Sequence, residues 1–177
     1  MSVAANRYAK ALLDVLYPKK ADTGYEQLSR LNTLLSEQPD ARRLLENPTV
    51  PAERRKGFLK EIADALGAMP EVRNFIDILI ERNRLGLLEE IIRTYQKFLD
   101  QKLGIVRAAV TAAVPLDERQ RSSLIAELQK ATGKQVRMEV SVDPALLGGV
   151  VARVDSTIYD GSLRQQLESF KVKLVQG

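Results

Sequence analysis

The 177-residue sequence contains no cysteine, no histidine and no tryptophan. The lack of cysteine excludes disulfide frameworks, thiolate zinc sites and thiol nucleophiles, and the lack of histidine excludes histidine-based triads and metal shells. A chain of this length still buries enough apolar surface to fold, as one large domain or two small ones. Any chemistry would depend on lysine, tyrosine or carboxylate side chains, which are far more often surface groups than catalysts. We expect no cofactor and no metal.

Long apolar runs are also missing from the sequence. No stretch approaches the length of uncharged residues that a bilayer span requires. Polar and charged residues interrupt the apolar positions from Asn6 onward, so the N-terminus lacks the core of a secretory signal. It also lacks the Arg-rich, Ser-rich character of an organelle import leader. We expect a protein of a bacterial-type cytoplasm that does not insert into the membrane directly.

Charge of one sign is not concentrated anywhere in the chain. The net charge is +4, with 17 basic and 15 acidic residues up to Gly104 and 10 basic and 8 acidic residues after it. The clusters Arg42-Arg43 and Arg54-Arg55-Lys56 have acids at helical spacing, which is typical of a solvated helix face. Nucleic-acid proteins concentrate basic residues and interleave aromatics, and here aromatics are few. We therefore expect no nucleic-acid partner.

Residues 1–104 show only helical periodicity. The first predicted helix runs from Ser2, which suits the N-cap, to Tyr17, and a leucine-rich helix follows it. The next three helices are predicted to begin at prolines, which suit a first helical turn: Pro39, Pro51 and Pro70. A sixth helix is predicted over residues 85–103. Six short helices with brief connections predict a compact helical bundle.

After Gly104 the apolar period changes from helical to alternating. Residues 105–114 and 135–143 alternate apolar and polar positions, which predicts two strands with one buried face each. A helix from Asp117 separates them and begins with a capping box. The predicted fold class is therefore α+β with two domains, a six-helix bundle over 1–104 and a small α/β domain over 105–177 with a short sheet and a C-terminal helix.

The adjacent glycines Gly148-Gly149 raise the question of a phosphate-binding loop. Such a loop leads from a strand into a helix N-terminus, whereas this pair leads into the apolar run VVARV, and no lysine follows. We interpret the pair as a bend before a strand, followed by a tight turn at Asp155-Ser156. A capping box at 162–165 predicts the start of the last helix. The apolar stripe of this helix contains Leu163, Leu167, Phe170 and Leu174. We favour packing of this stripe on the sheet over contact with a partner protein.

Four pieces of the sequence, in this order and spacing, carry a resemblance to a known family. They are AANRYAKAL at 4–12, NFI through ERNRL at 74–85, DPALLGG at 143–149 with Arg153, and DGS at 160–162 with Leu167. Together they resemble the delta subunit of F-type ATP synthases, which is related to the mitochondrial oligomycin sensitivity-conferring protein. The resemblance extends from near the first residue to the predicted last helix.

The resemblance implies a stator subunit without chemistry of its own, present in one copy per complex. In that family the helical domain holds the N-terminal helical segments of the alpha subunits, and the C-terminal domain holds the b subunits of the peripheral stalk. The implied location is the cytoplasmic face of the inner (plasma) membrane, as a peripheral part of the complex. The weaker candidates for stalk contact are Asp160, Arg164, Lys171 and Leu174.

The first and fifth predicted helices are apolar over more of their circumference than a surface helix needs. On residue types alone, we favour burial of both helices in the bundle. The resemblance favours a groove that binds an amphipathic helix. The predicted groove residues, with Arg82 at the rim, are Ala4, Tyr8, Ala11, Leu12, Val15, Phe75, Ile78, Leu79 and Arg82.

Two other classes of function stay open at this point. The calculated pI near 9.4 and the strand-helix-strand pattern suit a basic adaptor that binds RNA or a ribosomal surface. Its affinity would fall steeply with salt, whereas a contact built on apolar helix packing would be much less salt-sensitive. An enzyme ranks last, because no paired carboxylates, nucleophile-base pair or metal cluster emerges from the sequence.

Overall fold

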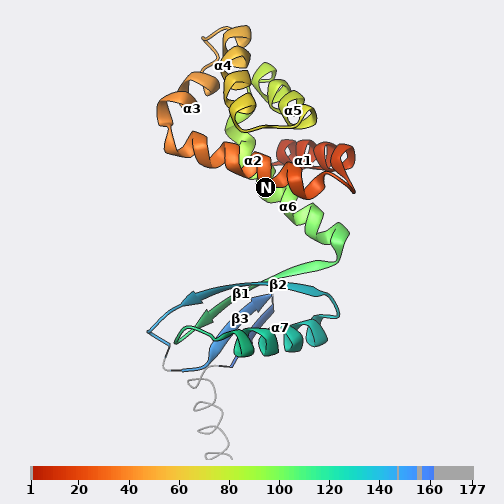
Figure 1. The fold of residues 1–177 in the computed structure, drawn as a ribbon, viewed down its shortest axis with the longest axis vertical. Helices are drawn as coiled ribbons and strands as arrows, with labels where there is room; N and C mark the ends of the chain where they lie inside the picture. The colour runs from red at the N-terminus through yellow and green to blue at the C-terminus, as the bar shows by residue number, and fades with distance from the viewer. Residues whose placement is uncertain (1, 147, 155–156, 162–177) are drawn as a thin grey trace, which may run out of the picture. The chain divides into compact units, whose positions relative to one another are not determined.

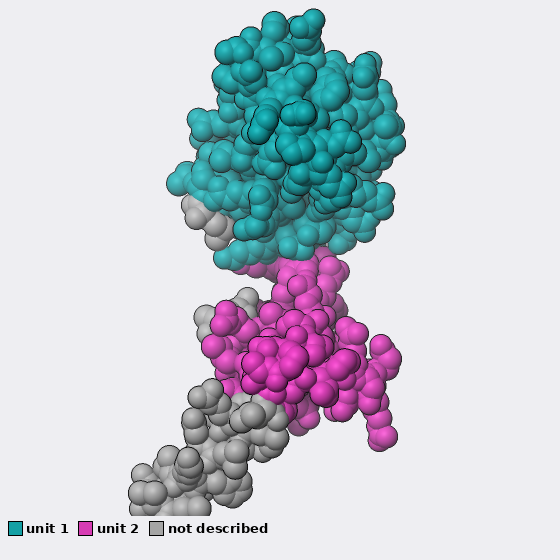
Figure 2. All heavy atoms as spheres, turned by 90° about the vertical axis from the view of Figure 1, so that its left-hand side faces the viewer, with its two compact units in different colours: residues 1–99 teal, residues 100–177 magenta. Residues whose placement is uncertain are grey.

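The computed structural model describes residues 2–146, 148–154 and 157–161 of the chain. The chain divides into two compact units, residues 1–99 and residues 100–177 (Figure 2). Within the described residues the fold is α+β, with seven α-helices and one four-stranded mixed sheet. The α+β class that the sequence predicts is confirmed.

Local sequence signals mark the starts of three of the helices before the sheet, whereas the helix predicted over 85–103 is a 3₁₀ turn followed by an α-helix (Figure 1). The Ser2 hydroxyl accepts a hydrogen bond from the backbone N–H of Ala4 at 3.2 Å and caps the first helix, as predicted. Pro39 and Pro70 are each the first residue of a helix, whereas Pro51 lies one residue before its helix. The elements are α1 (Val3–Leu16), α2 (Ala21–Glu37), α3 (Pro39–Glu46), α4 (Ala52–Ala65), α5 (Pro70–Glu81), the 3₁₀ turn η1 (Leu85–Leu87) and α6 (Leu88–Leu103).

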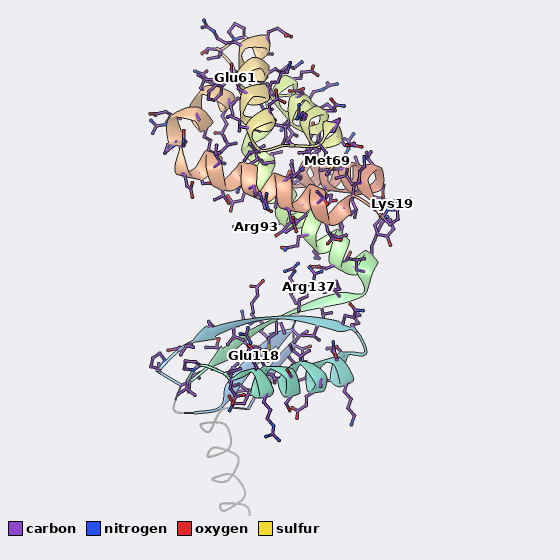
Figure 3. The ribbon with its side chains drawn as sticks, viewed as in Figure 1. Lys19, Glu61, Met69, Arg93, Glu118 and Arg137 are labelled. Atoms are coloured by element: carbon purple, nitrogen blue, oxygen red, sulfur yellow. The ribbon has the colours of Figure 1, made fainter. Side chains whose placement is uncertain are left out.

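The first unit has one continuous apolar core to which each of these helices contributes. Its largest fully buried side chains are Leu13, Leu16, Leu28, Leu35, Leu45, Leu59, Ile76, Leu79, Ile80, Leu88, Ile91 and Tyr95. The connection before α5 contains Met69, which is labelled in Figure 3. Gln27 of α2 holds this connection, because its side-chain oxygen accepts from the backbone N–H of Met69 at 2.9 Å. The same amide donates to the carbonyl of Gly67, so α2 supports the N-terminal end of α5.

Tyr95 of α6 brings a polar atom into the middle of this core. Its hydroxyl donates to the carbonyl oxygen of Ala21 at 2.9 Å, and the side chain is fully buried. Burial raises the pKa of the Tyr95 hydroxyl, so the group stays protonated and remains a donor.

We expect Tyr95→Phe to lower the free energy of unfolding by about 1 kcal/mol, because the phenylalanine ring fills the same space but leaves the carbonyl without this donor. Urea unfolding followed by far-UV circular dichroism measures the change. Tyr159→Phe, at an exposed tyrosine of the second unit, is the control and should change stability by less than about 0.5 kcal/mol. Equal stabilities of the two variants would contradict this role for Tyr95.

The interpretation of Arg54-Arg55-Lys56 as a solvated helix face is wrong for Arg55. Arg54 is exposed and Lys56 pairs with Glu81, but the Arg55 side chain lies in the interior of the first unit. Its guanidinium donates to the carbonyls of Val50 and Leu45 and to the Asn83 side chain. The spacing of residues along one helix does not show which hydrogen-bond acceptors other segments bring to a side chain. The burial of Arg55 could therefore not be predicted from the sequence.

The second unit contains a sheet of four strands in the order β2-β1-β3-β4. The strands are β1 (Ile105–Ala112), β2 (Gln135–Val142), β3 (Val150–Val154) and β4 (Thr157–Asp160). Strand β1 pairs in parallel with β2 and antiparallel with β3, and β4 is antiparallel to β3. The predicted alternation is confirmed in β1, where the side chains of Val106, Ala108, Val110 and Ala112 are all buried.

Helix α7 (Glu118–Thr132) lies along one face of this sheet (Figure 1). The predicted capping box is confirmed, because Asp117 accepts from the N–H of Gln120 and the Gln120 side chain accepts from the N–H of Asp117. Leu128 packs the helix onto the buried strand residues. Before β1, Asp100 in the last turns of α6 accepts two hydrogen bonds from the Arg107 guanidinium, at 2.6 and 3.2 Å.

The two adjacent glycines lie immediately before β3, so the predicted bend before a strand is confirmed. Gly148 and Gly149 have φ angles of 152° and 82°, which side-chain-bearing residues rarely adopt. The Gly149 carbonyl accepts from the N–H of Ala113, which ties the bend to the end of β1. The glycines therefore shape the chain where it enters β3, beside the end of β1.

Several sequence predictions lie outside the described residues. They are the turn at Asp155-Ser156, the capping box at 162–165, the last helix with its apolar stripe, and three stalk candidates, namely Arg164, Lys171 and Leu174. Within the described ranges, none of the helices combines the length and apolar character needed to cross a bilayer. The same ranges contain no group of three or more acidic, histidine or cysteine side chains that could hold a metal ion.

A candidate helix-binding groove

A concavity of about 610 Å³ lies on the first unit where α1 runs beside α5. Its lining residues are Ala4, Arg7, Tyr8, Ala11, Ile78, Arg82 and Arg84. Five of these, all except Arg7 and Arg84, are among the residues that the sequence predicts for a groove. The concavity therefore joins two segments that are far apart in the sequence, and we call it the α1–α5 groove.

An aromatic pair connects α1 to α5 beside the groove. Ala5 and Ala9 are fully buried, and Tyr8 beside them meets Phe75 of α5 edge to face. The ring centroids lie 6.3 Å apart at an interplanar angle of 76°, a favourable aromatic geometry. Tyr8 therefore contacts α5 and also lines the groove.

The predicted groove residues fall into two sets in the structure. Leu12, Phe75 and Leu79 are core residues, with Leu79 having no exposed surface. Ala4, Tyr8 and Ala11 line the groove, together with Ile78, which is 45% exposed. Val15 lies one turn beyond Ala11 on the same stripe of α1 and is 66% exposed. The broad apolar circumference of α1 and α5 thus serves the core on one side and lines a groove on the other.

Sequence reasoning missed two lining residues, Arg7 and Arg84. Arg7 is three residues after Ala4 and four before Ala11, so helical spacing could have placed it on the same stripe. Arg84 follows the end of α5, where the chain leaves the helix and Asn83 adopts a φ of 52°. No periodic signal extends through such a turn, so only the structure brings Arg84 to the groove.

Charge is distributed unequally around α5. On the side that faces α4, Glu81 pairs with Lys56 at 2.5 Å, and the hydrogen bond from this lysine lowers the pKa of the Glu81 carboxyl. Asp77 lies on that same side, where burial raises the pKa of its carboxyl. The groove lining, by contrast, contains three arginines and no acid. An apolar surface with a cationic rim suits the binding of a partner rather than bond-making chemistry.

The second unit has a smaller hollow of about 430 Å³ between α7 and the strands β3 and β4. Leu124 and Leu128 line it from the helix, and Val150 and Tyr159 line it from the sheet. Asp160, the stalk candidate among the described residues, is exposed and lies at this hollow.

Comparison with known proteins agrees with this architecture. The family model described as ATP synthase delta (OSCP) subunit matches residues 4–174. The chain is 42% identical over 177 residues to the ATP synthase subunit delta of Anaeromyxobacter sp. (strain Fw109-5), with 99% of each chain covered. It is 35% identical over 174 residues to the ATP synthase subunit delta of Geotalea uraniireducens (strain Rf4), covering 98% of this chain and 97% of the relative.

A solved structure shares the fold. A chain in the cryo-EM structure of the Toxoplasma gondii mitochondrial ATP synthase hexamer superposes with a TM-score of 0.68 at 21% identity, covering 99% of this chain and 98% of that one. The family assignment rests on the sequence matches, which extend over nearly the whole chain, and the shared fold agrees with it. The chain belongs to the ATP synthase delta (OSCP) subunit family, the non-catalytic stator subunits of F-type ATP synthases.

Proposed function

We propose that the α1–α5 groove binds the N-terminal helical segments of the alpha subunits of the catalytic head. The observation that carries the proposal is the exposed apolar surface at the groove, above all Ile78 at 45% exposure, beside alanines that let a partner backbone approach. An amphipathic helix laid into such a groove buries its apolar face, which is a common mode of peptide recognition.

We also propose that the two parts of the chain bind different partners. The helical part, residues 1–104, acts as one bundle that holds the head, and the α/β part, residues 105–177, holds the b subunits of the peripheral stalk. The hollow between α7 and the β3–β4 strands supports the second assignment, because it exposes apolar side chains beside Asp160. The protein would then act at the cytoplasmic face of the membrane, as one copy in the complex.

The function in this proposal is mechanical. A rotary synthase produces ATP only if the catalytic head does not turn with the central rotor, so the head needs a fixed connection to the membrane part. A subunit that holds the head at one end and the stalk at the other provides this connection. It must bind tightly at both ends, but no reaction has to occur on it.

Affinity purification of the tagged full-length chain from its own cells in mild detergent tests this function. We expect alpha, beta and b subunits to co-elute in amounts comparable with the tagged chain. A parallel purification after nuclease treatment is the control. Recovery of RNA or ribosomal proteins in place of these subunits, lost on nuclease treatment, would overturn the proposal.

A further inference from the structure

The three arginines of the groove form no ion pair with any carboxylate in the described part of the chain. We propose that Arg7, Arg82 and Arg84 bind carboxylates at one end of the partner helix and so fix the direction in which this helix lies in the groove. This inference rests on the proposed helix-binding function. It adds the chemistry of the partner, a short amphipathic helix with an acidic end.

Because α1 and α5 run in opposite directions, Arg82 and Arg84 lie beside the N-terminal half of α1, from which Arg7 also comes. Tyr8 meets Phe75, while Lys20, just beyond the C-terminal end of α1, pairs with Glu71 in the first turn of α5 at 2.6 Å. The N-terminal half of α1 therefore lies beside the C-terminal end of α5. Arg7 comes from the former and Arg82 from the latter, and Arg84 follows two residues on.

Toward the C-terminal half of α1 the groove lining carries no charged residue. Ala11 lines the groove there, and Val15 continues the exposed stripe of α1 one turn further. From Ala4 to Val15 the α1 stripe is roughly 16 Å long, which matches about three turns of a partner helix. The groove thus distinguishes the two ends of such a helix, one by charge and the other by apolar contact.

A favourable interaction with a helix dipole in the unbound protein explains two of the three groove arginines but not the third. Arg82 and Arg84 lie just past the C-terminal end of α5, where the helix dipole favours positive charge. Arg7 lies in the N-terminal half of α1, where the dipole offers no such advantage. Three guanidinium groups around one concavity repel each other, and carboxylates of a bound helix would relieve this repulsion.

The expected electrostatic contribution is moderate because the arginines are solvent-exposed. Exposed ion pairs contribute little individually, and three of them together would change the dissociation constant about tenfold. Binding should also weaken as salt rises, since screening acts on exposed charges. Salt sensitivity alone would then not separate the stator from an RNA adaptor, and the test must vary the charge of the peptide.

The experiment measures, by isothermal titration calorimetry, the affinity of the full-length protein for a synthetic peptide of the N-terminal segment of its cognate alpha subunit. A second peptide carries glutamine and asparagine in place of glutamate and aspartate. We expect the triple variant Arg7→Gln, Arg82→Gln, Arg84→Gln to bind the acidic peptide about tenfold more weakly and with less salt dependence. It should bind the amide peptide as the parent does.

The matched control also removes three positive charges, but from other positions of the first unit. Its substitutions are Arg30→Gln, Arg43→Gln and Arg54→Gln. These arginines are exposed and do not line the groove. The control variant should bind both peptides like the parent. An equal loss in the control would show that net charge, and not the groove arginines, attracts the peptide, and would overturn the inference.

Ile78→Asn separates this inference from the function on which it rests. We expect it to weaken the binding of both peptides, because it removes apolar contact without changing charge. If it does so while the arginine variant binds both peptides like the parent, the inference alone is wrong. If Ile78→Asn leaves both affinities unchanged, the groove assignment itself fails. Loss of binding to phosphatidylglycerol vesicles in the arginine variant, with unchanged peptide affinity, would assign the arginines to a lipid surface and overturn the inference.

Discussion

Ile78→Arg should weaken the binding of the alpha-subunit peptide by on the order of 2–4 kcal/mol, roughly 30- to 700-fold in the dissociation constant. The variant places a charge where the partner helix would remove water, and a guanidinium without an acceptor is costly to desolvate. It also adds a fourth cation to a groove that already has three. The change can be measured by isothermal titration calorimetry with the full-length protein.

The fold should tolerate Ile78→Arg, because nearly half of this side chain is in solvent. Leu44→Arg is the matched control, since Leu44 of α3 is also a partly exposed apolar residue but lies outside the groove. Both variants should keep the circular dichroism spectrum and the unfolding midpoint of the parent. If Ile78→Arg and Leu44→Arg bind the peptide equally well, the groove lies elsewhere on the molecule.

Arg55→Ala should lower the free energy of unfolding of the first unit by about 3–5 kcal/mol, which is the largest stability change that we expect. Arg55 is 4% exposed, and its guanidinium satisfies three acceptors. Nε donates to the Val50 carbonyl at 3.0 Å, Nη1 to the Leu45 carbonyl at 3.3 Å, and Nη2 to the Asn83 side chain at 3.0 Å. Alanine leaves these acceptors without a donor and opens a cavity.

One side chain thus connects the end of α3, the start of α4 and the turn after α5. Arg55→Lys should recover only part of the lost stability, because an ammonium group lacks the planar fork that reaches the separate acceptors. Urea unfolding followed by circular dichroism suits the measurement, since the chain has no tryptophan.

The neighbouring residue supplies the control for Arg55→Ala. Arg54 is exposed, so Arg54→Ala removes the same charge from the same helix and should change stability by less than about 0.5 kcal/mol. The proposed structural role of Arg55 would be wrong if both alanine variants unfolded at the same urea concentration with the same slope.

Because Arg84 and Asn83 belong to the same turn, Arg55 also links the core to the groove. Asn83 accepts from Arg55 and holds a left-handed backbone conformation, and the next residue lines the groove. The position of Arg84 therefore depends on the same turn that Arg55 secures. A variant at Arg55 should be assessed for peptide binding only under conditions where it is fully folded.

Features that depend on a few neighbouring residues could be predicted from the sequence alone. Ser2 and Asp117 start helices because each side chain caps an N–H within three residues. The change of apolar period after Gly104 marks the passage to strands. Family membership followed from motifs in a fixed order, and the absence of cysteine and histidine restricted the chemistry. Each of these signals can be read along the chain without knowing what packs against it.

The sequence did not predict which apolar residues of α5 line the groove or which charged side chains meet, because both depend on the packing of distant segments. Ile78 and Leu79 are adjacent apolar residues of one helix, yet the first lines the groove and the second has no exposed surface. Arg54 and Arg55 differ in the same way, because the acceptors of Arg55 include Asn83, which is 28 residues away in sequence. Exposure is a property of the neighbours that packing brings from distant segments, and local periodicity carries no information about those neighbours.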